Sequence, residues 1–328
     1  MKLQNVLSLF DGMSCGQLAL QRAGISYENY FASEIDKYAM KVAMTNFPDT
    51  KQLGDVCNVK GEELPQIDLL LGGSPCQGFS VAGKRLNFED PRSKLFFEFV
   101  RLLKECKPRY FLLENVVMKQ EYQDIITEHL GVRPVMINSS RFSAQDRKRL
   151  YWTNIPLPIC GIENPSTVED ILEDEVDAKY CVEPTLQVAI CKNEVARKKI
   201  AHIGKAGQAS DIFKIYDKAV TLCANGGGWG AKTGLYALPC LTPDRVEKRQ
   251  NGRRFKPPHS KFYTLTALDK HGVLTNNFIR RLTPIECERL QTVPDNYTAS
   301  VSDSQRYKML GNGWTVDVIA WILKNIKE

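Results

Sequence analysis

The 328-residue sequence predicts an α/β protein, in which a doubly wound, mostly parallel sheet is followed by a smaller β-rich domain. The first indication is the alternation of strand-like and helix-like stretches as far as residue 155. The second is that residues 67–71, apart from Asp68, and residues 110–113 are apolar, which is typical of strands buried on both faces of a sheet. The third is that this alternation stops near residue 159, where glycine, proline, threonine and lysine become frequent.

The expected elements of the sheet domain follow in a regular order. Residues 6–10 form a strand, and residues 15–23 form a helix that Gly24 closes. Residues 30–34 form a second strand, and the helix after it cannot continue through Pro48. The later predicted elements are strands at residues 67–71, 110–113 and 150–153 and an amphipathic helix around residues 95–103.

Three parts of the chain are predicted from these patterns. Residues 1–158 form the sheet domain and residues 159–299 the β-rich, loop-rich domain. Residues 300–328 return to the sheet domain, because apolar helical periodicity resumes beside the Gly-Asn-Gly sequence at 311–313. Between Lys192 and Arg281 the chain has 18 Lys and Arg against 6 Asp and Glu, although its total net charge is only +6. Such a basic block is typical of a segment that binds a polyanion, and the alternative is a basic face that is only solvated.

Composition excludes several classes of protein. Hydrophobic residues make up 43% and charged residues 25%, as in ordinary globular proteins, and no apolar run is long enough to span a membrane. The N-terminus has no signal-peptide pattern. The ten cysteines include no Cys-x-x-Cys pair and do not cluster with the four histidines, which predicts reduced thiols and no metal site. We expect a cytoplasmic protein that is a monomer.

Polar residues stand where the predicted strands end. Asp11, Glu34, Asp55, Cys76 and Glu114 each lie at or just after the end of a predicted strand or apolar run. Ligands of doubly wound sheets bind at the carboxyl ends of the strands. The sequence therefore predicts the functional site at this edge of the sheet.

Two turns at this edge have chemical potential. The glycine-containing turn at residues 10–16 precedes Glu34, which is placed to hold the hydroxyls of a ribose. The pyrophosphate-binding Gly-x-Gly-x-x-Gly pattern is missing, so a nucleoside without phosphates fits this turn better than a dinucleotide does. The alternative is that the turn has only a structural role. In the second turn, Pro75 and two glycines present Cys76 as a nucleophile, with a buried structural cysteine as the alternative.

A carboxylate and a basic strand complete the candidate groups. Glu114 ends a buried strand, where a charge needs a partner or a proton. The alternatives are a helix N-cap and a structural ion pair. Strand alternation directs Gln145, Arg147 and Arg149 to one side, where arginine forks could hold carbonyl or phosphate oxygens. A solvated basic strand is the alternative.

Eight short motifs follow one another along the chain. They are Phe10-x-Gly12-x-x-x-Gly16, Glu34 in Ser-Glu-Ile-Asp, Gly54-Asp55-Val56, Pro75-Cys76-Gln77, Glu114-Asn115-Val116, Gln145-x-Arg147-x-Arg149, Arg281-Leu282-Thr283-Pro284-x-Glu286-x-x-Arg289-Leu290-Gln291 and Gly311-Asn312-Gly313. In this order they closely resemble the DNA cytosine-5 methyltransferase family of bacteria and phages, over nearly the whole chain. The resemblance implies a Rossmann-like, class I S-adenosylmethionine-dependent methyltransferase that methylates carbon 5 of cytosine in double-stranded DNA.

The same resemblance implies roles for individual residues. Cys76 would attack carbon 6 of a flipped cytosine, Glu114 would bind ring nitrogen 3 and the amine, and Arg149 with Arg147 would hold the carbonyl oxygen. Residues 1–158 would then be the catalytic, cofactor-binding domain. The implied S-adenosylmethionine-binding residues are Phe10, Asp11, Gly12, Ser14, Gly16, Glu34, Ile35, Asp55, Val56, Pro75, Leu95, Asn312 and Trp314.

The family places its variable target-recognition region where the basic block lies. We therefore expect residues 159–299 to be the target-recognition domain and the segment 165–276 to read the DNA. Arg253 and Arg254 are assigned to phosphates, and Thr221-Leu222 or Thr264-Leu265 to the family's Thr-Leu element. The full set of expected DNA-binding residues is Gln77, Ser80, Thr221, Leu222, Trp229, Arg253, Arg254, Thr264 and Leu265.

Two positions depart from the commonest family pattern. Asp11 stands where many relatives have alanine or serine, and Gly313-Trp314 replaces the commoner Ser-Val. A tRNA cytosine-5 methyltransferase and a catalytically inactive DNA-binding relative are the alternatives. The long basic region disfavours the first, and the intact catalytic residues disfavour the second. The Cys76 turn disfavours an amino-methylating enzyme, and the missing phosphate-binding pattern disfavours an NAD oxidoreductase.

Overall fold

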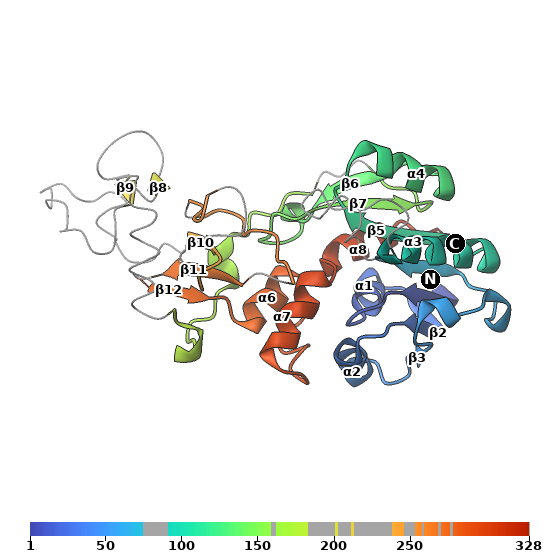
Figure 1. Ribbon diagram of the computed structural model, residues 1–328, viewed down its shortest axis with the longest axis horizontal. Coiled ribbons are helices and arrows are strands. Elements are labelled where there is room, and N and C mark those ends of the chain that lie inside the picture. Colours follow the sequence, from blue (N-terminus) through green and yellow to red (C-terminus); the bar gives the residue numbers. More distant parts are fainter. Residues whose placement is uncertain are drawn as a thin grey trace, which may run out of the picture.

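The computed structural model describes residues 1–74, 91–158, 162–182, 201–202, 211–212, 238–245, 253–257, 259–267, 270–275 and 278–327. Figure 1 shows a large sheet with its helices on one side of the view and a small sheet on the other, with helices α6 and α7 between them. Within the described residues, no helix has the length and apolar character needed to cross a membrane.

The large sheet has seven strands in the order β3-β2-β1-β4-β5-β7-β6. The first five strands in this order are parallel, whereas β7 runs antiparallel to both β5 and β6. This confirms the predicted doubly wound, mostly parallel α/β fold. The strands are β1 (Lys2–Leu9), β2 (Ser26–Ser33), β3 (Lys51–Gln52), β4 (Leu69–Gly72), β5 (Tyr110–Val116), β6 (Val135–Asn138) and β7 (Lys148–Thr153).

Side chains of the central strands alternate between two apolar cores, one on each face of the sheet. In β4, Leu69 and Leu71 belong to one core and Leu70 to the other. Helices α1 and α8 pack on the first core, and α3 and α4 on the second. These helices, with α2, are α1 (Cys15–Ala23), α2 (Lys37–Asn46), α3 (Pro91–Cys106), α4 (Gln120–Leu130) and α8 (Val316–Leu323).

Local sequence explains how the helices begin and end. Gly24 adopts φ 71° and closes α1, where a side chain would be strained, as predicted. The Asp36 carboxylate accepts hydrogen bonds from the first backbone N–H groups of α2. Thr283 and Glu286 form a reciprocal capping box at the start of α6 (Pro284–Leu290). After α7 (Asp303–Asn312), α8 packs against α1, and Arg22 pairs with Asp317 across them.

The small sheet has its own core. Strands β10 (Leu238–Leu241), β11 (His271–Thr275) and β12 (Phe278–Arg281) form an antiparallel meander, and β8 (Ala201–His202) pairs with β9 (Asp211–Ile212). The meander contributes to an apolar cluster that is separate from the two cores of the large sheet. Short 3₁₀ helices are η1 (Val56–Asn58), η2 (Gly61–Glu63), η3 (Ser139–Arg141), η4 (Val168–Ile171) and η5 (Ala178–Tyr180).

Candidate active site and cofactor pocket

The glycine-containing turn after β1 is fastened to Glu34, the residue that follows β2. Glu34 Oε2 accepts a hydrogen bond from the Gly12 backbone N–H at 2.8 Å. Its Oε1 accepts from the N–H groups of Ile35 at 2.7 Å and Asp36 at 2.8 Å. Phe10, Gly12 and Ser14 all have positive φ, so the turn is tightly wound. Parallel pairing of β1 with β2 thus brings two of the predicted motifs together.

Asp11 lies inside this turn and is buried. The Tyr30 hydroxyl donates a hydrogen bond to its Oδ1 at 2.8 Å. Burial removes the water that would stabilise its charged form and raises the pKa of Asp11 to about 6. The same burial raises the pKa of Tyr30 well above its ordinary value. Asp11 therefore contributes a carboxyl group that titrates closer to neutrality than an exposed aspartate does.

The other predicted cofactor residues surround the same strand ends in different degrees of exposure. Ile35 is 75% exposed, the highest fraction among the large apolar side chains of the described residues, and it follows Glu34 directly. Asp55 is exposed and accepts from the Cys57 N–H, while Val56 is buried. Of the remaining predicted positions, Ser14 and Gly16 are buried, Leu95 is partly buried and Asn312 is exposed.

Glu114 and Arg149 form an ion pair at the end of β5. Arg149 Nε lies 3.0 Å from Glu114 Oε1, and the two side chains are only 14% and 11% exposed. Antiparallel pairing of β5 with β7 sets Glu114 opposite Tyr151 and Val116 opposite Arg149, so the two charged residues are diagonal neighbours on one face. The predicted carboxylate and arginine are therefore together, because the sheet inserts β7 beside β5.

Trp314 also contacts Glu114, although the two residues are 200 positions apart. The indole Nε1 donates a hydrogen bond to Glu114 Oε2 at 3.1 Å. Trp314 was predicted only as a possible cofactor residue, and nothing in the sequence linked it to this glutamate. Nearby, the Asn115 side-chain amide donates to the Ser74 hydroxyl at 3.1 Å, which ties the end of β5 to the end of β4.

Arg147 is buried and uses its guanidinium differently from Arg149. It donates to the backbone carbonyl oxygens of Leu265 at 2.9 Å, Gly311 at 3.2 Å and Gly313 at 3.0 Å. These carbonyls belong to two segments far from Arg147 in the sequence. The Arg147 guanidinium thus bonds to backbone carbonyl oxygens, whereas the Arg149 guanidinium pairs with the Glu114 carboxylate.

The segment at residues 259–267 lies against the strand that carries these arginines. Gln145 forms a β-bridge with Phe262, and the Thr264 hydroxyl donates to the Asp146 carbonyl oxygen at 2.7 Å. Leu265 is buried and accepts from Arg147. Thr264-Leu265, one of the two candidate Thr-Leu elements, therefore lies next to the predicted active site.

The two arginines assigned to phosphates differ. Arg253 is exposed, as a phosphate contact requires. Arg254 is only 2% exposed, and its guanidinium donates to the Arg245 carbonyl oxygen at 2.7 Å. The phosphate assignment of Arg254 is therefore corrected, because its side chain is buried and bonds to the backbone of Arg245.

Several predicted residues lie outside the described residues, and their predicted roles remain predictions. They are Pro75, Cys76, Gln77, Ser80, Thr221, Leu222 and Trp229. Among the described residues before them, Gly73 lies close to Glu114 and Trp314, since a Cβ built there would come within 3.4 Å of both side chains.

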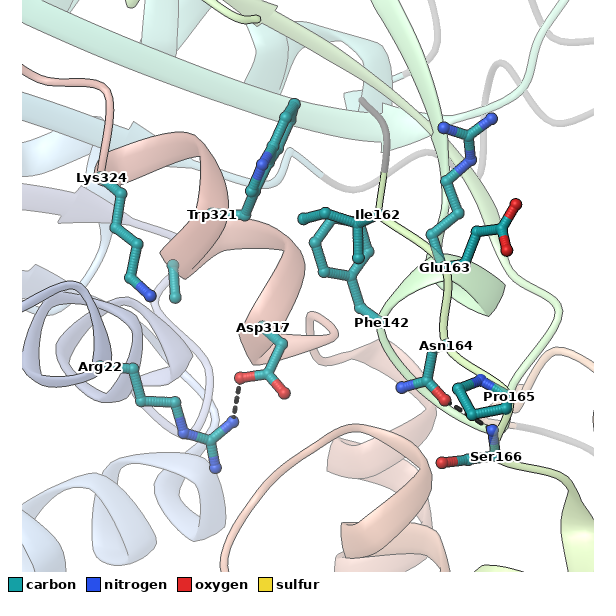
Figure 2. A pocket seen from close by; sticks show the side chains of 12 residues that line it. Arg22, Phe142, Ile162, Glu163, Asn164, Pro165, Ser166, Asp317, Trp321 and Lys324 are labelled. Carbon is teal, nitrogen blue, oxygen red and sulfur yellow. Dashed lines mark hydrogen bonds and ion pairs between the residues drawn. The ribbon is translucent and has the colours of Figure 1, made fainter. Parts of the chain in front are cut away.

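A separate cavity of about 370 Å³ lies away from these strand ends, between α1, α8 and residues 162–166 (Figure 2). Trp321 of α8, Lys324 directly after that helix, Phe142 and Ile162 line it, beside the ion pair of Arg22 with Asp317. It includes none of the predicted site residues.

Known proteins share both the sequence and the fold. Residues 4–328 match the C-5 cytosine-specific DNA methylase family. The chain is 31% identical to the orphan methyltransferase M.SPRI of Bacillus phage SPR, over 98% of this chain and 97% of that protein. It is 28% identical to the type II methyltransferase M.HhaI of Haemophilus parahaemolyticus, over 98% and 93%. The Entamoeba histolytica methyltransferase EhMeth has a similar fold, with a TM-score of 0.65 and 18% identity over 99% of this chain and 98% of that one. Because the match extends over nearly all of its length, the chain belongs to the family of C-5 cytosine-specific DNA methylases.

Proposed function

We propose that this DNA cytosine-5 methyltransferase acts through a covalent bond between Cys76 and a cytosine flipped out of duplex DNA. The observation that supports this proposal most directly is the Glu114–Arg149 ion pair in β5 and β7, in which Arg149 Nε lies 3.0 Å from Glu114 Oε1. It supports the proposal because a flipped base offers an amine, a ring nitrogen and a carbonyl oxygen, which a carboxylate and an arginine can bind.

The proposed reaction gives each residue a defined task. The Cys76 sulfur bonds to carbon 6 of the ring, and Glu114 binds ring nitrogen 3 and the amine while negative charge develops. Arg149 is assigned to the carbonyl oxygen. Carbon 5 then takes the methyl group, loses its proton to a base, and the bond from carbon 6 to sulfur breaks. Arg147 is assigned to holding the backbone around this site, since it donates hydrogen bonds to three backbone carbonyl groups.

The residues at the ends of β1 and β2 fit S-adenosylmethionine. The Glu34 carboxylate would receive ribose hydroxyls, and the exposed Ile35 side chain offers an apolar surface for an adenine ring. Asp55, Val56, Leu95 and Asn312 are assigned to the same pocket, as are Phe10, Gly12, Ser14, Gly16 and Pro75. When bound, S-adenosylmethionine supplies an electrophilic methyl group on its sulfonium.

The test is bisulfite sequencing of plasmid DNA from cells that lack other cytosine methylation and express the chain. Wild type should protect cytosines within one recurring sequence, and Cys76→Ser should protect none, because a hydroxyl is a much poorer nucleophile than a thiolate. Wild-type protein that folds and leaves every cytosine unprotected would overturn the proposal. The recurring sequence would at the same time identify the recognised site.

A further inference from the structure

We infer that Trp314 is a positioning residue for Glu114, rather than a residue whose main task is to line the cofactor pocket. This rests on the proposed function, in which Glu114 binds the cytosine ring. The indole Nε1–H donates to Glu114 Oε2 at 3.1 Å, while Arg149 Nε pairs with Oε1 at 3.0 Å. Each carboxylate oxygen thus has its own donor, and the two donors approach from different segments of the chain.

Two donors on opposite oxygens fix the plane of the carboxylate. A single ion pair leaves the terminal torsion of a glutamate free to rotate, since that torsion has broad minima. Each carboxylate oxygen accepts up to two hydrogen bonds, so both oxygens keep capacity for a base. Trp314 and Arg149 therefore hold Glu114 in one orientation without using up the groups that would meet the cytosine.

The indole itself has little freedom to move away. Its Nε1 lies 2.9 Å from the place where a Cβ at Gly73 would be, so a side chain at position 73 would collide with it. The preceding carbonyl oxygen, that of Gly313, accepts hydrogen bonds from Arg147 at 3.0 Å and from the Gln291 amide at 3.3 Å. The loop that carries Trp314 is thereby fastened to buried groups on two other segments.

The geometry separates two uses of this position. A residue that mainly contacts cofactor should affect cofactor affinity when altered. A residue that orients Glu114 should affect the rate of methyl transfer after both ligands are bound. Trp314→Phe keeps an aromatic ring and removes the N–H donor, so it distinguishes the two uses.

The first experiment compares Trp314→Phe with wild type and with Trp321→Phe, the same change on α8 beside the cavity of Figure 2. We expect Trp314→Phe to lower the single-turnover rate at saturating cofactor and DNA by about tenfold, and to change cofactor affinity by less than about threefold. Trp321→Phe should match wild type. An unchanged rate in Trp314→Phe, or a loss confined to cofactor affinity, would overturn the inference.

A second experiment does not depend on activity or on the stability of Trp314→Phe. The indole N–H resonance of Trp314 in a nitrogen-15 spectrum should move upfield in Glu114→Ala, because its acceptor is gone. The resonances of Trp152, Trp229 and Trp321 are the internal references. An unmoved Trp314 resonance would contradict the hydrogen bond. A wild type that does not methylate DNA would instead refute the proposed function, so the two failures are distinguishable.

Discussion

Glu114 and Arg149 are diagonal neighbours across two antiparallel strands, in a sheet whose other central strands are parallel. The pair depends on β7, which turns back beside β5 and presents Arg149 on the same face as the carboxylate. Because both side chains are largely removed from water, their attraction is less screened than that of a surface ion pair.

Replacing either partner alone should therefore lower the free energy of unfolding more than replacing both. We expect Arg149→Ala and Glu114→Ala to show a coupling energy of about 1–3 kcal/mol in the free energy of unfolding. Urea unfolding of wild type, both single variants and the double variant measures it. The exposed pair of Lys2 with Glu28 is the matched control and should couple by less than about 1 kcal/mol. Equal coupling in the two cycles would contradict the energetic role given to burial.

The covalent step gives a chemical prediction. Wild type incubated with S-adenosylmethionine and duplex DNA that contains 5-fluorocytosine should form a stable protein–DNA adduct, because fluorine cannot leave as a proton does. Denaturing electrophoresis detects the adduct, and Cys76→Ser should form none. An active enzyme that gives no adduct would rule out the Cys76 mechanism.

Glu34→Ala should weaken cofactor binding far more than DNA binding. Its carboxylate would bond ribose hydroxyls, and it already accepts from the Gly12 N–H that shapes the turn. Each charge-assisted bond contributes about 1.5–3 kcal/mol, so a loss of at least tenfold in cofactor affinity is expected. Calorimetry with cofactor measures it, and Glu34→Gln should be intermediate because the amide keeps one acceptor oxygen. Unchanged affinity in Glu34→Ala would remove Glu34 from the pocket.

The buried Asp11 should make stability depend on pH. Its pKa is about 6 in the folded chain, above the ordinary 3.8, so the folded state binds the proton more tightly than the unfolded state does. Stability should thus fall as pH rises from about 4 to 6, and the penalty above pH 6 is on the order of 3 kcal/mol.

Asp11→Asn removes this penalty. It should be more stable than wild type at pH 8, by roughly 1–3 kcal/mol, and should lose most of that advantage at pH 4.5. Tyr30→Phe removes the donor to Asp11 and should be destabilised more at pH 8 than at pH 4.5. Urea unfolding at the two pH values measures both variants. The same difference from wild type at both pH values would show that Asp11 does not titrate as described.

Arg253 and Arg254 should respond differently to salt. Arg253→Ala should reduce the dependence of log affinity for DNA on log salt by about one unit, on specific and random duplexes alike. Arg254→Ala should instead lower the stability of the small domain, because its guanidinium holds the Arg245 carbonyl. Titrations of each variant with specific and random duplexes at several salt concentrations distinguish these two effects. An unchanged slope in Arg253→Ala would exclude it from phosphate contact.

The sequence predicted what local patterns can encode. Strands were placed but shortened: residues 6–10 and 30–34 were expected where Lys2–Leu9 and Ser26–Ser33 form. The first half of each strand contains polar, partly exposed residues, and only the second half is fully buried. The apolar pattern therefore shows only the second half of each strand. The predicted ends at residues 10 and 34 lie one residue beyond Leu9 and Ser33, and Glu34 contacts the turn at Gly12, whereas the strand expected to end at residue 113 continues to Val116.

Long-range packing accounts for what the sequence did not reveal. The Trp314 contact with Glu114 spans 200 positions and depends on how the last loop returns to the sheet. Arg254 stands beside Arg253 and looks identical in the sequence, yet only one is exposed. Neither result follows from spacing or charge, since each depends on a surface built by other segments.

The contacts of residues 259–267 with residues 144–147 determine which part of this chain could be transplanted. Phe262, Thr264 and Leu265 are joined to Gln145, Asp146 and Arg147 through backbone groups, so this short stretch is built into its host even though it is numbered within the recognition region. A chimera that exchanges sequence specificity between relatives should keep the recipient's own residues 259–267. The segment that can be exchanged would then end before residue 259. A chimera that also exchanges residues 259–267 would change one side of their contacts with residues 144–147 and leave the other side unchanged.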